Sequence, residues 1–92
     1  MLTTKDLSKV DRTYFDVLAS NAFSLTLRSK NTGHCWHLLL QEYPTFKSIQ
    51  VYHTHHYGTP YHLHGHAKNI TAALSDIKKH DAFQMGGRKM CR

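Results

Sequence analysis

The N-terminal segment has apolar residues at three- and four-residue steps. This spacing places them on one face of a helix, and it predicts an amphipathic helix over residues 4–20. Thr3 or Thr4 can cap this helix, and Asp6 suits its first turn because the helix dipole stabilises a carboxylate there. The predicted apolar face consists of Leu7, Val10, Tyr14, Val17 and Leu18.

The central part of the chain alternates between apolar and polar residues, which is typical of half-buried strands. Residues 22–29 and 34–41 have this pattern, and the residues between them include Gly33, so they predict a β-hairpin. Residues 48–56 and 61–66 predict two further strands. One face of the second predicted strand carries His34, Trp36, Leu38 and Leu40.

A second helix is predicted over residues 69–84, with Asn69 as its cap. The expected fold is α+β: a helix, three or four antiparallel strands and a helix, with both helices on one face of the sheet. We expect a single domain over residues 1–87, followed by a basic, mobile tail over residues 88–92. The apolar face of the second helix consists of Ile70, Ala73, Leu74 and Ile77.

This order of elements is similar to that of double-stranded-RNA-binding domains and of small toxins that share their fold. Ribonuclease toxins with this order carry a catalytic histidine on a strand after a glycine turn. The resemblance implies His34 or His37, which follow Gly33, as a general base or acid. The alternation around Trp36 favours the other interpretation, in which this strand only anchors the core.

Histidines are concentrated in one short region, because six of the nine lie between His53 and His66. Residues two apart in a strand share a face, so His62, His64 and His66 are expected on one side of the last strand. If that strand pairs with residues 48–56, imidazoles from both strands can converge on a divalent ion such as zinc. The candidate metal ligands are His53, His55, His62 and His64.

The same region has two other interpretations. Histidine and tyrosine on an open sheet face can stack across strands without an ion, and they offer aromatic platforms for bases. The stretch 58–65 also resembles the histidine–hydrophobic–histidine motif of rolling-circle replication initiators and plasmid relaxases. That resemblance implies His62 and His64 as metal ligands, with His53, His55 or His56 as the third. The tyrosine nucleophile of these enzymes has no clear match, although Tyr14 can be considered for the role.

The formal charge of +6 is unevenly distributed, and residues 78–92 carry five cations against one acidic residue. Such a segment suits contact with phosphates, and it equally suits a solvated tail that keeps the protein soluble. Cys35 and Cys91 lack the spacing of a zinc or redox pair, so a reducing, cytoplasmic setting is expected. We expect no signal peptide, membrane span or membrane-surface helix.

These observations favour a small basic binding module that contacts nucleic acid or a ribonucleoprotein through a His/Tyr-rich sheet face and the basic C-terminus. No catalytic residue is assigned. One alternative is an inhibitor or adaptor that binds a nucleic-acid enzyme, as mobile-element anti-defence proteins do, and another is a metal-dependent nuclease that uses His53–His66. The predicted phosphate contacts are Arg28, Lys30, Lys78, Lys79, Arg88 and Lys89, and the predicted stacking residues are Tyr52, Tyr57 and Tyr61.

Overall fold

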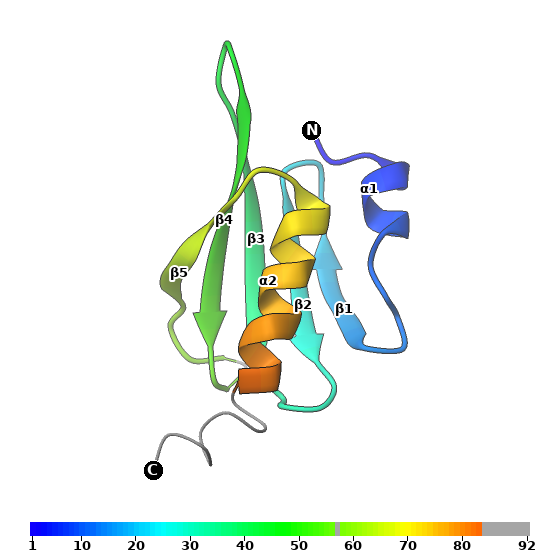
Figure 1. Cartoon of the computed structure of the whole chain (residues 1–92), viewed down its shortest axis with the longest axis vertical. Coiled ribbons are helices and arrows are strands. Elements are labelled where there is room, and N and C mark those ends of the chain that lie inside the picture. Colours follow the sequence, from blue (N-terminus) through cyan, green and yellow to red (C-terminus); the bar gives the residue numbers. More distant parts are fainter. Residues whose placement is uncertain (57, 84–92) are drawn as a thin grey trace.

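The computed structural model describes residues 1–56 and 58–83, and a five-stranded antiparallel sheet forms its centre (Figure 1). The elements are α1 (Thr4–Ser8), β1 (Phe15–Ser20), β2 (Ser24–Ser29), β3 (Cys35–Glu42), β4 (Lys47–Thr54), β5 (His62–Ala67) and α2 (Ile70–Ala82). The strands lie in chain order in the sheet, and α2 crosses one face of it (Figure 1). Within the described ranges, no helix has the length and apolar character needed to cross a membrane.

The N-terminal helix is much shorter than the sequence predicts, and the prediction of a helix over residues 4–20 is wrong. α1 ends at Ser8, and β1 begins at Phe15. Between them, the carboxylate of Asp11 accepts hydrogen bonds from the backbone and hydroxyl of Thr13, which starts a turn. Pairing with β2 then gives β1 a ladder of backbone hydrogen bonds and buries Phe15 to 1% exposure. An exposed continuation of the helix would have neither the backbone pairing with β2 nor the burial of Phe15.

β1 also explains why the sheet has five strands instead of the three or four expected. The other four strands and α2 match the predicted segments, with ends shifted by one or two residues. Gly33 has a φ of 76° in the turn between β2 and β3, a conformation that glycine adopts without steric cost. Asn69 caps α2 as predicted, because its side chain accepts a hydrogen bond from the backbone of Ala72 at 2.8 Å.

The core lies between the sheet and the elements that cover its α2 side. Leu74 and Ile77 of α2 pack there, and so do Leu7 and Val10 of the N-terminal segment. The two helical segments therefore cover the same face, and none of the described helices covers the opposite face, which we call the uncovered face. The strands contribute Phe15, Leu25, Leu27, Trp36, Leu38, Ile49, Val51 and Ala67 to the core.

Trp36 is the largest fully buried side chain of this core. Its indole nitrogen donates a hydrogen bond to the hydroxyl of Ser29, which is also fully buried, at 3.1 Å. The bond satisfies the one polar atom of the tryptophan side chain and ties β3 to the end of β2.

Replacing Ser29 with alanine should leave the Trp36 N–H buried without its partner. We expect the Ser29→Ala variant to lose about 1–3 kcal/mol of unfolding free energy. The matched control is Ser20→Ala on the exposed end of β1, which should change stability by less than about 0.5 kcal/mol. Urea unfolding followed by tryptophan fluorescence measures both, and equal stability of the two variants would contradict the assigned role.

Candidate functional site

Alternation along β4 places histidine and tyrosine on opposite faces, so they do not form the single His/Tyr-rich face expected from the sequence. His53 lies on the α2 side of the sheet with Val51 and is 2% exposed, whereas Tyr52 lies on the uncovered face. The cross-strand register places Trp36 of β3 directly opposite His53, and His53 opposite His62 of β5. The α2 side of the sheet therefore carries a row made of one indole and two imidazoles.

A bulge in β5 changes the arrangement that simple alternation predicts. The register shifts at His64, which has no directly paired residue on β4, and its ring meets Trp36 edge-on at 5.3 Å. Beyond the bulge, His66 pairs with Gln50 and so lies on the uncovered face. The prediction that His62, His64 and His66 share one face is therefore wrong for His66.

Six imidazole rings gather where the last turn of α2 meets the sheet, and three of them contact Trp36. His53 stacks on Trp36 with ring centroids 4.2 Å apart, and His80 of α2 meets the indole edge-on at 5.4 Å. His34 stacks on His55 at 4.5 Å with nearly parallel rings. We call this group the histidine cluster, and its members are His34, His53, His55, His62, His64 and His80.

Three members of the cluster form a tighter group, with one ring nitrogen of each within 4.8 Å of the others. They are His34, His53 and His80, and the His34 Nδ1 and His53 Nε2 atoms are hydrogen bonded at 3.1 Å. Of the four predicted metal ligands, only His53 belongs to this group. The other three predicted ligands, His55, His62 and His64, surround it as ring contacts.

Two residues of the tight group were absent from the predicted metal set, although the sequence held a signal for each. His34 precedes Trp36 by two residues, so strand alternation already placed both on one face. His80 follows Ile77 by three residues, which continues the apolar stripe of α2 towards the sheet. The register between β3 and β4, which brings Trp36 opposite His53, and the docking of α2 on the sheet join these local signals into one site.

Three members of the histidine cluster, His34, His53 and His64, have lowered pKa values. Burial, together with the neighbouring imidazoles of His34 and His80, lowers the pKa of His53 from 6.5 to about 3. Partial desolvation lowers the pKa of His34 and also that of His64 at the edge of the cluster, and nearby imidazoles act in the same direction. A neutral imidazole keeps one nitrogen lone pair, so these rings can accept hydrogen bonds or bind a cation at neutral pH.

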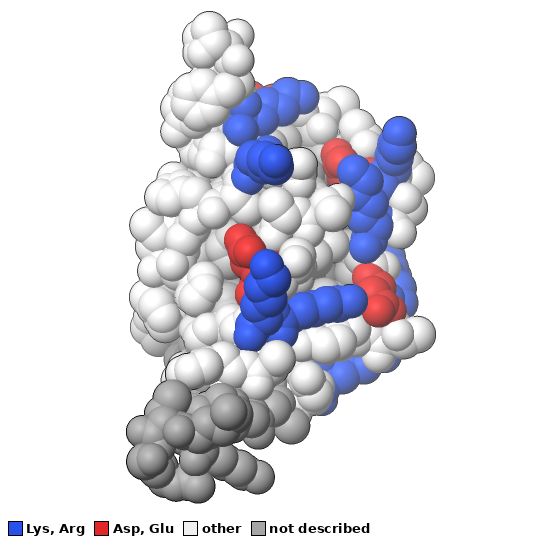
Figure 2. Space-filling view, in the orientation of Figure 1, with Lys and Arg blue, Asp and Glu red and all other residues white. Residues whose placement is uncertain are grey.

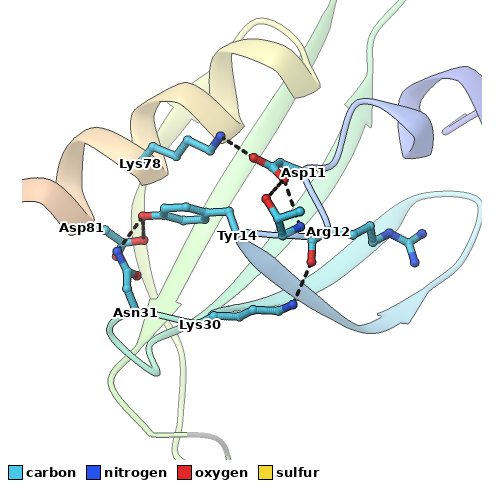
Figure 3. Close-up of polar contacts among 8 residues, drawn as sticks. Asp11, Arg12, Tyr14, Lys30, Asn31, Lys78 and Asp81 are labelled. Carbon is cyan, nitrogen blue, oxygen red and sulfur yellow. Dashed lines mark hydrogen bonds and ion pairs between the residues drawn. The ribbon is translucent and has the colours of Figure 1, made fainter.

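A polar network fixes the end of α2 beside the histidine cluster (Figure 3). The buried carboxylate of Asp81 accepts hydrogen bonds from the hydroxyls of Tyr14, at 2.7 Å, and Thr32, at 3.3 Å. Burial and the bond to Asp81 raise the pKa of Tyr14 to about 12, so its hydroxyl stays protonated. Lys78 lies over the Tyr14 ring and pairs with Asp11 at 3.3 Å. Tyr14 thus serves as a packed anchor between β1 and α2.

The four predicted phosphate-binding cations that the structure describes do not form one surface. Arg28 lies on the uncovered face, whereas Lys78 and Lys79 belong to α2 on the other side. Arg28 and Lys30 both approach Asp16, at 3.3 and 3.9 Å. Figure 2 shows the α2 side, where lysine and arginine side chains are spread out and carboxylates lie against several of them. Among the remaining predicted contacts, Tyr57, Arg88 and Lys89 lie outside the described residues, as does the predicted tail 88–92.

The uncovered face carries a second group of rings. His37 of β3 lies opposite Tyr52 of β4, with ring centroids 6.3 Å apart, and the ring of Tyr61 lies 6.1 Å from His37. His37 Nδ1 is hydrogen bonded to the hydroxyl of Thr26 at 2.9 Å. Leu63 of β5, paired with Tyr52, is 51% exposed. This face therefore combines aromatic, polar and apolar groups across four strands.

Comparison with known proteins gives no family model, curated protein or solved structure that matches the chain. The geometry of the two faces is therefore the basis for the functional proposals below.

The lowered pKa of His53 predicts that the metal-free protein is sensitive to acid. His53 binds a proton near pH 6.5 in the unfolded chain, but in the folded chain it does so only near pH 3. Folding stability is thus fully present above about pH 6.5 and falls as the pH drops, by about 1.4 kcal/mol per pH unit for each such proton.

Urea unfolding between about pH 7.5 and 4.5 measures this slope. The His53→Gln variant should have a shallower slope than the wild type, because it removes the group with the largest difference between folded and unfolded states. The control is His66→Gln on the uncovered face, which should keep the wild-type slope. A wild-type stability that is constant over this range would show that His53 is not held neutral.

Proposed function

We propose that the protein is a small binding module that contacts single-stranded nucleic acid through the uncovered face. The observation that carries this proposal is the group of three rings, His37, Tyr52 and Tyr61, on a sheet face that no described helix covers. Unstacked bases bind to sheet faces by stacking on aromatic side chains of this kind. The net charge of +6 supports a polyanionic ligand.

The polar groups around the rings add the contacts that such a ligand needs. The hydroxyl of Thr26 and the amide of Gln50 lie on the same face and can bond to base edges. Arg28 lies at one end of this face, where it pairs with Asp16. Because both side chains of that pair are more than 40% exposed, the pair contributes little, and a phosphate can replace Asp16 at small cost.

Loss of the Tyr52 ring should weaken binding to a labelled single-stranded oligonucleotide. Stacking contributes about 1–3 kcal/mol per base, so the Tyr52→Ala variant should bind about 5- to 150-fold more weakly. Fluorescence anisotropy measures the affinity, which should also fall steeply as salt rises from about 50 to 200 mM.

The control for this experiment is Tyr43→Ala, because Tyr43 lies at the tip of the β3–β4 hairpin and away from the three rings. This variant should bind like the wild type. Circular dichroism shows whether the Tyr52→Ala variant remains folded. An affinity that does not change with salt concentration would contradict the proposal. Equal binding by the Tyr52→Ala and Tyr43→Ala variants would contradict it as well.

A protein partner is the second candidate, and the shape of the β3–β4 hairpin favours it. This hairpin extends beyond the rest of the sheet (Figure 1), and Tyr43 and Phe46 stack at its tip with 45% and 58% of their surfaces exposed. Met1, whose amino group pairs with Glu42, adds another exposed apolar side chain nearby. An inhibitor or adaptor could use this tip as its contact. This function is favoured if the protein has no affinity for RNA or DNA and binds a defined protein through Phe46.

The nuclease interpretation has less support from the geometry. The resemblance to replication initiators and relaxases implies His62 and His64 as metal ligands, but the tight group of ring nitrogens includes neither. Tyr14, the tyrosine considered as nucleophile, donates a hydrogen bond from its hydroxyl to the buried Asp81. We therefore propose binding rather than cleavage.

A further inference from the structure

We propose that His34, His53 and His80 form a binding site for a single divalent transition-metal ion, with zinc as the preferred ion. The three residues come from different parts of the fold: the start of β3, the end of β4 and the last turn of α2. One ring nitrogen of each lies within 4.8 Å of the other two. The site is thus assembled only when the helix is packed on the sheet.

The distances fit tetrahedral zinc. Zinc binds imidazole nitrogen at about 2.0–2.1 Å, which places two ligand nitrogens of a tetrahedron about 3.3–3.4 Å apart. The His34 Nδ1 and His53 Nε2 atoms are already 3.1 Å apart. The ligand nitrogen of His80 lies within 4.8 Å of the other two, so the three nitrogens would move closer together when an ion binds.

The donor set selects the kind of metal. Three imidazole nitrogens suit zinc, copper or nickel, whereas magnesium and calcium prefer carboxylate, carbonyl and water oxygens. The one carboxylate next to the ligands in sequence, Asp81, is occupied by the hydroxyls of Tyr14 and Thr32. The site therefore has the nitrogen chemistry of a zinc centre and lacks the oxygen ligands of a calcium or magnesium centre.

Neighbouring rings hold the three ligands in place. Trp36 stacks on His53 at 4.2 Å, and His55 stacks on His34 at 4.5 Å, which restricts the rotation of both ligand rings. The bond from Tyr14 to Asp81 (Figure 3) and the bond from Thr32 to Asp81 fix the helical turn that carries His80.

A fourth ligand can come from water or from an exposed ring of the histidine cluster. His55 lies 4.9 Å from the His53 ring, and His64 lies 4.9 Å from the His80 ring. Both side chains are exposed, so the fourth position is on the solvent side of the site. A bound ion would link α2 to β3 and β4, and it should stabilise the folded state because the unfolded chain lacks the assembled site.

The test uses untagged protein, stripped with a chelator and then titrated with zinc. Isothermal titration should give one zinc per chain, and thermal unfolding should shift upwards by several degrees when zinc is added. The His80→Ala variant should lose zinc affinity by at least about 100-fold and lose the thermal shift. His34→Ala is a second variant with the same expectation, so that a folding failure in one does not decide the outcome.

The matched control is His66→Ala, which removes an exposed histidine from the opposite face. It should bind zinc like the wild type. Far-ultraviolet circular dichroism without metal shows that each variant is folded. Absence of zinc binding by the stripped wild type would overturn the proposal, and so would wild-type affinity in folded His80→Ala and His34→Ala variants. Loss of affinity in His66→Ala would overturn it too, because it would indicate non-specific binding by surface histidines.

Discussion

The stack of Trp36 on His53 is the contact on which the arrangement of both faces depends. The two residues lie opposite each other on neighbouring strands, and both are buried under the last turn of α2. The hydrogen bond from the indole nitrogen of Trp36 to the Ser29 hydroxyl fixes the position of the indole ring in the core. With the indole in this position, the rings of His64 and His80 have one common surface to pack against.

This contact also divides the chemistry of the sheet between its two faces. Because His53 points towards α2, its neighbour Tyr52 must point to the uncovered face, where it meets His37. Six imidazoles thus gather on the α2 side, where burial lowers the pKa of His53, and the partly exposed rings of Tyr52 and Tyr61 lie on the uncovered face. The two proposals, a metal site and a nucleic-acid surface, use opposite sides of the same strands. Either can therefore fail without removing the other.

The sequence predicted the features that depend on local pattern. Alternation located β2 to β5, and the Asn69 cap located the start of α2. It failed where two local patterns competed, as in the segment after Ser8, where helical spacing masked a strand. This segment forms a strand instead of a helix because pairing with β2 buries Phe15.

The candidate sites were less predictable because they depend on contacts between distant parts of the chain. The bulge at His64 places His66 on the uncovered face, and no residue type in β5 predicts a bulge at this position. His34 and His80 join His53 only through the β3–β4 register and the docking of α2. Likewise, the pairing of Arg28 with Asp16 depends on β1, which the sequence did not reveal.

A direct test of the central claim is nuclear magnetic resonance of the His53 imidazole nitrogens in metal-free protein. If His53 is buried against Trp36, its ring should stay neutral between about pH 7.5 and 5, since its pKa is about 3, and it should show nuclear Overhauser contacts to the indole. A His53 ring that titrates near pH 6.5 and shows no contact with Trp36 would contradict the account of both faces.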